Sequence, residues 1–270
     1  MESNANWISV GDLADGFAPD SHILPPCFDL PGLTIKLAFE DATTQDLAIE
    51  RQGNEQAIKT PDNRTLPVRV TSLRQGIYFV DYLDQQTSIT LLIDLSSGRA
   101  LRIFGTLPNA EGCSQSLLNR AQSGLPLTGV EAVFQAGHIV GQTEASGFER
   151  TKELIGKRVR YRYSTTELYE HIYLNESFYT WHCISGVEAG LADTDRCHYF
   201  KLGHQLYLFI WQEKIVPTLG VVMVDFEQNK TDGKIFGYAG FNTGNYANFS
   251  IGALARFAND TPAPDMAPWS

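Results

Sequence analysis

Short apolar stretches alternate with short polar ones along most of the chain. The apolar stretches are rich in aromatic and β-branched residues, and clusters of Gly, Asn, Asp and Ser separate them. Segments of this kind at a spacing of about ten residues predict an antiparallel sandwich or barrel. The strands that this pattern predicts are 77–82, Ser88–Leu95, Val159–Tyr163, His171–Leu174, Phe178–Ile184, Cys197–Lys201, Leu206–Trp211 and Val221–Phe226.

Helical periodicity is weak by comparison. Two segments, Leu117–Gln122 and Phe148–Leu154, predict short helices within the Gly-rich and less regular stretch from 107 to 155. The segment 259–270 is rich in proline, which predicts an extended tail.

The predicted strands form two related series. Four pairs of segments align, and their offset grows from 124 to 132 residues, as loop insertions would make it. A period this long indicates a duplicated domain, because solenoid repeats span about 20–50 residues. The aligned pairs are Gly32–Phe39 with Gly156–Tyr163, Ile77–Asp84 with Leu206–Glu213, Leu91–Asp94 with Val222–Asp225, and Ile103–Gly105 with Ile235–Gly237.

We therefore expect an all-β chain of two tandem antiparallel β-barrels of the calycin or lipocalin type, produced by internal duplication. A small antiparallel barrel can hold one ligand in its interior. The expected organisation is an amino-terminal barrel, the degenerate copy, in 1–110, a linker in 111–155, a carboxy-terminal barrel with a pocket in 156–258 and the tail in 259–270.

Composition narrows the range of partners. A length of 270 residues favours about two domains, and a net charge of −10 argues against nucleic acid and against an anionic membrane surface. Arg158, Arg160 and Arg162 alternate along one predicted strand, so we expect them on a solvated outer face.

The four cysteines show no CxxC pair and no histidine at zinc-finger spacing, so we expect no structural metal. The amino terminus lacks the pattern of a signal peptide, and no apolar run is long enough to span a membrane. The expected setting is cytoplasmic, with free thiols.

The two copies differ most where chemistry is expected. In the second copy, Tyr161 and Tyr163 replace apolar residues, and they share one face because side chains two apart on a strand point the same way. Tyr207, Trp211 and Glu213 share a face of another strand. If both faces line one interior, loss of water raises the pKa of Glu213 and makes it a usable general acid or base. In the alternative, Glu213 leaves the barrel at a strand end and pairs with Lys214 or solvent.

Two histidines and an acidic segment are further candidates. His171 shares a face with two tyrosines, whereas His182 lies opposite Trp181 on a strand of which either face could point inward. A lone histidine on a strand is more often structural than catalytic. Asp193 and Asp195, with Glu188, lack the spacing of an EF-hand and predict a turn capped by aspartates.

The motifs YEHIY, YTWHCISGVEAGLADTD and LYLFIWQEK, which cover Tyr169–Lys214, resemble the MoaF family, a two-domain family named for the molybdenum cofactor. The residues themselves show neither the clustered basic donors nor the glycine-rich anion cradle that a pterin phosphate would favour. The region 156–213 also distantly resembles bacterial phenolic acid decarboxylases. These are small lipocalin-like barrels that remove CO2 from hydroxycinnamates without a cofactor. The residues that carry this second resemblance are Gly156–Tyr163, Tyr169, Glu170, Asn175, Ser185, Gly186, Lys201, Leu202, Tyr207, Trp211 and Glu213.

This second resemblance implies roles for individual residues. It places the decarboxylase tyrosine pair on Tyr161 and Tyr163 and the catalytic glutamate on Glu213. The arginine beside the substrate falls on Leu191, and an isobutyl group cannot replace a guanidinium that binds oxygen anions. Decarboxylation of hydroxycinnamates is therefore not expected, although the acid and the phenols remain.

The leading hypothesis is a cofactor-independent lyase or isomerase that acts on a small phenolic or conjugated molecule. Its catalytic residues are Glu213, Tyr161 and Tyr163, the tyrosines acting as oxyanion-type donors. One alternative is a lipocalin-like binding protein that uses the same pocket without catalysis. Another is a purely structural pair of barrels in a homodimer. The expected substrate-binding residues are Trp211, Tyr179, Trp181, His182, Leu191, Tyr207 and His171.

Overall fold

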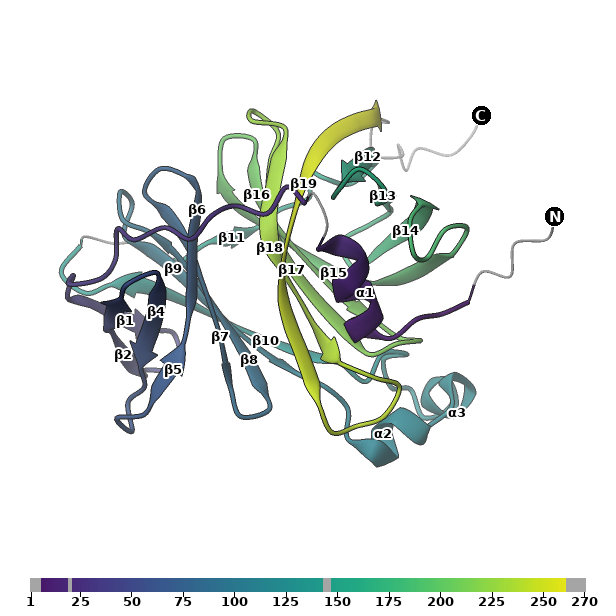
Figure 1. The fold of residues 1–270 in the computed structure, drawn as a ribbon, viewed down its shortest axis with the longest axis horizontal. Helices are drawn as coiled ribbons and strands as arrows, with labels where there is room; N and C mark the ends of the chain where they lie inside the picture. Colours follow the sequence, from purple (N-terminus) through teal and green to yellow (C-terminus); the bar gives the residue numbers. More distant parts are fainter. Residues whose placement is uncertain (1–5, 19–20, 143–146, 261–270) are drawn as a thin grey trace, which may run out of the picture. The chain divides into compact units, whose positions relative to one another are not determined.

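The computed structural model describes residues 6–18, 21–142 and 147–260. The chain forms two compact units (Figure 1). One comprises Ile23–Glu149, and the other combines Met1–His22 with Arg150–Ser270. We call them the first and the second unit and describe each by itself. No helix in the described ranges is both long and apolar enough to cross a membrane.

The second unit is a closed antiparallel barrel of eight strands. Each strand pairs with the next in sequence, β19 returns to pair with β12, and the pairing of β15 with β16 completes the closure. The two-residue strand β11 (Glu149–Arg150) extends this sheet at β15. The barrel strands are β12 (Lys157–Arg162), β13 (Leu168–Tyr173), β14 (Phe178–Ser185), β15 (Ala192–Gly203), β16 (Leu206–Glu213), β17 (Thr218–Asp225), β18 (Lys230–Tyr238) and β19 (Tyr246–Asp260).

The first unit is a half-barrel sheet of seven strands with a separate sheet of three. The seven-stranded order is β2-β1-β10-β9-β8-β7-β6, and the small sheet has the order β3-β4-β5. Helices α2 (Ala110–Ser114) and α3 (Leu117–Gln122) precede β10. The strands are β1 (Ile35–Phe39), β2 (Thr44–Leu47), β3 (Ile49–Gln52), β4 (Glu55–Lys59), β5 (Thr65–Pro67), β6 (Arg69–Arg74), β7 (Ile77–Asp84), β8 (Thr87–Asp94), β9 (Arg99–Thr106) and β10 (Glu131–Ile139).

The internal duplication is visible in the strand order. The aligned segments fall on β1 and β12, on β7 and β16, on β8 and β17, and on β9 and β18, which hold corresponding places in the two sheets. Even the turns agree. Asp94 Oδ1 accepts hydrogen bonds from the backbone N–H groups two and three residues later, and so does Asp225 Oδ1. The all-β fold of two related units is thus confirmed.

Three segments differ from the predictions made from the sequence, and one predicted helix is confirmed. Phe148–Leu154 is not helical, since it contains β11 and a turn. Glu131–Ile139 lies within the expected linker 111–155 but forms β10, which pairs with β9 and β1. Its alanines and glycine gave little strand signal. Strand β19 reaches Asp260, into the expected tail, whose remaining residues lie outside the described ranges. The expected helix Leu117–Gln122 is present as α3.

A helix that the sequence analysis missed, α1 (Val10–Phe17), belongs to the second unit. Ser9 is its N-cap, and its side chain accepts a hydrogen bond from the backbone N–H of Asp12. The helix lies against the barrel, where the Gly11 N–H donates to the Ala239 carbonyl at 3.1 Å. A Cβ at Gly11 would lie 2.4 Å from that oxygen, so the close approach requires glycine.

Strand β12 shows why this sequence builds a barrel wall. Val159 and Tyr161 are buried while Arg158, Arg160 and Arg162 are exposed, as the alternation predicts. On the outer face, the Glu170 carboxylate pairs with Arg158 and Arg160, and these ion pairs lower its pKa against the opposing effect of burial.

Candidate active site in the second barrel

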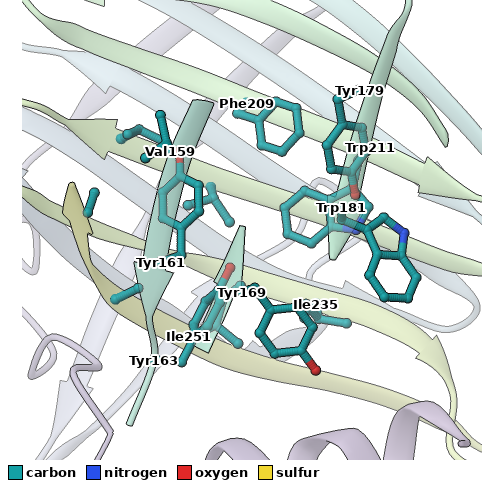
Figure 2. Close-up of a cluster of buried hydrophobic side chains, with 14 of the residues drawn as sticks. Val159, Tyr161, Tyr163, Tyr169, Tyr179, Trp181, Phe209, Trp211, Ile235 and Ile251 are labelled. Atoms are coloured by element: carbon teal, nitrogen blue, oxygen red, sulfur yellow. The ribbon is translucent and has the colours of Figure 1, made fainter. Parts of the chain in front are cut away.

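Aromatic side chains from several strands fill the interior of the second barrel (Figure 2). Tyr161 and Tyr163 enter from β12 and the segment just after it, Tyr169 from β13, Trp181 from β14 and Trp211 from β16. Such rings supply a large apolar surface that keeps a few polar groups at defined positions. The polar groups among them are three carboxyl groups, a histidine and the phenols.

Glu213 ends β16 and lines a cavity in this interior. The indole Nε1 of Trp211 donates to Glu213 Oε1 at 2.8 Å. Trp211 itself lies over Gly220 on β17, where a Cβ would approach the indole to 2.1 Å. Glu213 keeps partial solvent exposure, yet desolvation is the largest influence on its carboxyl group. Burial, followed by the negative charges of Asp195 and Glu188, raises the pKa of Glu213 well above its ordinary value of 4.5.

Asp195 lies beside Glu213 and accepts hydrogen bonds from Trp181 and from both the backbone N–H and the ammonium group of Lys214. Trp181 Nε1 donates to Asp195 Oδ2 at 3.0 Å, and the Lys214 ammonium lies 3.3 Å from Asp195 Oδ1. Lys214 also pairs with Asp193 at 2.5 Å. Burial raises the pKa of Asp195, and the Lys214 charge offsets part of that rise. The Lys214 ammonium is therefore positioned to neutralise the aspartates of β15.

Glu188 is the third carboxyl group and comes from the turn between β14 and β15. The Tyr169 hydroxyl donates to Glu188 Oε2 at 2.9 Å. The turn is anchored by Glu167, whose carboxylate accepts from the Val187 N–H, and it uses glycine at position 186 with φ +130°. Burial raises the pKa of Glu188. Glu188 and Glu213 both line the cavity, and burial favours the neutral form of each carboxyl group.

His171 lines the same cavity from β13. Its ring lies 4.6 Å from that of Tyr161 and 5.1 Å from that of Tyr179, centroid to centroid. Burial lowers the pKa of His171 to about 3, so the imidazole is neutral. Its Nδ1 has no hydrogen-bond partner among the described residues. A buried polar atom of this kind costs about 1–3 kcal/mol unless a ligand or water satisfies it.

The cavity between these groups measures about 30 Å³ and is covered by α1. This is room for about one water molecule. Leu13 and Phe17 of α1 form part of its wall. The Phe17 ring stacks on Tyr169 with a centroid distance of 5.6 Å and meets Tyr163 edge-on at 4.6 Å. Phe17 therefore occupies an aromatic slot directly beside the carboxyl groups.

Five of the ten residues predicted for the site line this cavity: Tyr163, His171, Trp181, Trp211 and Glu213. Tyr161 and Tyr179 are buried in the same aromatic cluster but do not line the cavity. The Tyr161 hydroxyl is 2.5 Å from that of Tyr173, so the two phenols satisfy one another. Of the predicted tyrosine pair, Tyr163 thus lines the cavity and Tyr161 does not.

The other three predicted residues lie elsewhere. Leu191 is buried in the aromatic cluster but is not among the cavity-lining residues. The Tyr207 hydroxyl donates to Glu153 Oε2 at 2.6 Å, away from the cavity. His182 is on the outer face of β14, because Trp181 and Cys183 on either side of it point inward. The expectation that His182 contacts a ligand in the pocket does not fit this placement.

Sequence reasoning missed four contributors: Glu188, Asp195, Tyr169 and α1. The sequence around the acidic residues predicts only a capped turn, because neither Asp195 nor Glu188 shares a strand with Glu213. Their proximity arises only when β15 pairs with both β14 and β16. Across the ranges 6–18, 21–142 and 147–260, no group of three or more His, Cys, Asp or Glu side chains is arranged to hold a metal ion.

Comparison with known proteins agrees with the two-unit organisation. The family model described as the MoaF N-terminal domain matches residues 5–109, and the MoaF C-terminal domain matches residues 148–261. The chain is 43% identical to Protein MoaF of Klebsiella aerogenes over 265 residues, which covers 97% of this chain and 98% of that protein.

A solved structure from Burkholderia vietnamiensis, provisionally described as a β-lactamase, matches 41% of this chain and 99% of its own length. Its TM-score is 0.33 and its sequence identity 16%. The resemblance to phenolic acid decarboxylases stays a prediction. The two family models and the relative from Klebsiella aerogenes together show that the chain belongs to the MoaF family.

Proposed function

We propose that the second barrel is the active site of a cofactor-independent lyase or isomerase. Its substrate is a small, uncharged, conjugated aromatic molecule, and Glu213 is the acid–base residue. The observation that carries this proposal is the raised pKa of Glu213 in a buried cavity that also contains an unpartnered histidine nitrogen among the described residues. Perturbed carboxyl groups in a cleft are typical of acid–base sites.

Proton donation is the first step of the proposed reaction. At neutral pH a carboxylic acid with a strongly raised pKa is a proton donor, and such an acid can hydrogen-bond a substrate oxygen. Isomerisation then needs no other reagent. Glu213 gives its proton to one atom of the substrate and takes a proton from another, so the carboxyl group returns to its initial state. The Tyr163 phenol and the neutral His171 ring can hold the substrate oxygen meanwhile.

Charge defines the substrate class. Burial raises the pKa of Glu213, Glu188 and Asp195, and the charges of Asp195 and Glu188 raise that of Glu213 further. Leu191 adds an apolar group to the same buried cluster. A carboxylate substrate would have to lose its water among aromatic rings and carboxyl groups, without a guanidinium to bind it. An uncharged ketone or phenol fits this environment better.

Phe17 supports the aromatic character of the substrate. Its ring already fills a slot between Tyr163 and Tyr169, with one stacked and one edge-on contact. The same two rings can bind a substrate ring once α1 withdraws, since the cavity of about 30 Å³ holds no more than a small solvent molecule. Opening of α1 is therefore part of the proposed catalytic cycle.

The test uses para-hydroxybenzalacetone, an uncharged conjugated phenol, in heavy water. We expect the wild-type chain to catalyse deuterium uptake next to its carbonyl group, followed by NMR. Loss of a general acid–base residue costs roughly 100-fold or more in rate, which is the expected effect of Glu213→Gln. Glu176→Gln, an exposed glutamate outside the barrel interior, is the matched control and should leave the rate unchanged.

Equal rates in wild type and Glu213→Gln, or no uptake above the uncatalysed rate, would reject the catalytic role. Binding of the probe to both proteins without uptake would instead favour a lipocalin-like binding protein. A ligand-binding titration by NMR on the same samples distinguishes these two outcomes.

A further inference from the structure

Four arginines gather on the outer face of the second barrel, where β12 pairs with β19 (Figure 1). Arg158, Arg160 and Arg162 alternate along β12, and Arg256 of β19 lies directly opposite Arg160. All four side chains are exposed. We call these four residues the arginine face. A chain with a net charge of −10 thus carries a concentrated basic surface on its second unit.

The fold does not need these arginines. Strand β1 of the first unit aligns with β12, and it has Thr34, Lys36 and Ala38 at the positions of the three β12 arginines. It still pairs with a strand on either side, as β12 does. Two like charges directly opposite one another, such as Arg160 and Arg256, also destabilise a sheet. The arginine face therefore points to a partner that supplies negative charge.

Glu170 holds two of the arginines in place. It faces Arg160 across the pairing of β12 with β13, and its side chain is only 3% exposed although it lies on the outer face. Arg158 Nη2 donates to Glu170 Oε2 at 2.5 Å, and Arg160 Nε donates to Glu170 Oε1 at 3.1 Å. Guanidinium groups that are already restrained lose less conformational entropy when a partner binds.

The other two arginines are not neutralised. Neither Arg162 nor Arg256 has an ion-pair partner among the described residues. Besides Glu170, the acidic residue on β12, β13 and β19 is Asp260, which pairs with Lys157 at 2.9 Å instead. Positive charge on this face thus remains available to a partner.

The extent of the arginine face indicates the size of that partner. Arg158 and Arg162 are four residues apart on an extended strand, which is about 14 Å. This span exceeds a single carboxylate or phosphate group, so the partner must carry several anionic groups.

The neighbours of Arg162 favour a protein over other polyanions. Leu168 and Leu254 lie on either side of Arg162 in the sheet, and Leu254 is 39% exposed. Arginine is enriched in protein interfaces, where apolar and polar contacts are mixed. The net charge of −10 disfavours the dense phosphate arrays of nucleic acids and anionic membranes.

We propose that the arginine face docks an acidic, extended segment of a partner protein, with carboxylates at alternate residues. Alternate residues of an extended chain are about 6.8 Å apart, which is also the spacing of successive arginines along β12. Carboxylates on one side of the segment can therefore meet several guanidinium groups at once. The interaction surface is separate from the barrel interior and does not depend on the chemistry proposed for Glu213.

The experiment titrates the full-length chain with the peptide acetyl-Glu-Leu-Glu-Leu-Glu-amide at low ionic strength and follows backbone amide signals by NMR. Binding should shift the signals of Arg160, Arg162 and Arg256 and should weaken as salt is added. The same peptide with glutamine in place of glutamate should leave these signals unchanged. The double variant Arg162→Gln/Arg256→Gln should bind the acidic peptide about fivefold more weakly or less, as the loss of two exposed ion pairs implies.

Two further variants separate the role of charge from effects on folding. Arg162→Lys/Arg256→Lys keeps both charges and should retain most of the affinity. Lys36→Gln removes an exposed charge at the position of the first unit that aligns with Arg160, and it should bind like the wild type.

Three results would each overturn the proposal: absence of shifts in the wild type, equal binding of the two peptides, and unchanged affinity in the double glutamine variant. Tighter binding of a thymidine oligonucleotide or of phosphatidylserine vesicles than of the acidic peptide would also overturn it, because the partner would then not be a protein.

Discussion

The indole Nε1 of Trp211 donates a hydrogen bond of 2.8 Å to Oε1 of Glu213, two residues further along the inward face of β16. This bond lowers the pKa of the carboxyl group, whereas burial and the charges of Asp195 and Glu188 raise it more strongly. Trp211 therefore orients a carboxyl group whose surroundings favour the protonated form. The proposed chemistry depends on both effects.

Removal of the indole donor should raise the pKa of Glu213 further. Trp211→Phe keeps an aromatic ring over Gly220 but cannot donate to Oε1, so the ionised carboxylate loses a stabilising partner. Carbonyl infrared spectroscopy across a pH titration measures the change. Trp181→Phe, which removes a donor to Asp195, is the comparison and should act mainly on that group. A lower pKa of Glu213 in Trp211→Phe would contradict this account.

The raised pKa of Glu213 also predicts how stability depends on pH. A folded-state pKa above the unfolded value means that the folded chain binds the proton more tightly. The contribution of Glu213 to the free energy of unfolding is fully present below pH 4.5, its ordinary pKa. This contribution is lost as the pH rises through the pKa of Glu213 in the folded chain. As the pH increases through this range, the free energy of unfolding should therefore decrease less for Glu213→Gln than for the wild type. Chemical denaturation at a series of pH values measures both proteins, and parallel curves would exclude the effect.

His171 predicts the opposite dependence at acid pH. Burial lowers its pKa from 6.5 to about 3, so between these pH values the unfolded chain is protonated at this residue and the folded chain is not. The stability from this group is present above 6.5 and is lost as pH falls towards 3. His171→Phe should reduce that loss, while the exposed His204→Phe should not. The same denaturation series provides the measurement. If His171→Phe loses as much stability at acid pH as the wild type, the imidazole is not buried in its neutral form.

Gly220 should tolerate no side chain. A Cβ there would lie 2.1 Å from the Trp211 indole, so Gly220→Ala must displace that ring. Overpacking of this kind costs about 1–3 kcal/mol. Near-ultraviolet circular dichroism should show the altered environment of the tryptophan, and denaturation the loss of stability. Gly244→Ala is a suitable control, because nothing lies within 4 Å of its added methyl group.

Phe17→Ala should enlarge the cavity beside Glu213. Truncation of a buried phenylalanine costs about 3–5 kcal/mol and leaves an apolar void. Such a void can bind a small aromatic molecule, so phenol should bind to this variant more tightly than to the wild type and should partly restore its stability. Phe241→Ala removes a phenylalanine that is 72% exposed and should show neither effect. Thermal denaturation with and without phenol tests the prediction.

Alternation of polar and apolar residues was sufficient to predict β7, β8 and β12 to β17, which are eight of the nineteen strands among the described residues. It placed Trp211 and Glu213 on one face of β16 but left open whether that face points inward, which the structure decides. Local pattern alone could not reveal α1, since its eight residues include two glycines and carry one short apolar stripe. It also could not reveal β10, in which only two of nine residues are buried.

The acidic surroundings of Glu213 were beyond sequence reasoning for a different reason. Asp195 and Glu188 come from separate elements, and a single sequence does not say which strands pair when a barrel closes. His182 illustrates the same limit, because the sequence allows either face of Phe178–Ser185 to point inward. The buried positions of Trp181 and Cys183 decide the matter in the structure.

The helix that covers the second barrel is translated long before the strands that it contacts. Phe17 is synthesised first, the whole first unit follows, and Tyr163 and Tyr169 come only afterwards. Contacts between such distant parts of a sequence form late and slowly during folding. We therefore expect the nascent first unit to reach its native state while α1 is still unstructured, so that docking of this helix is the last event in the maturation of the protein.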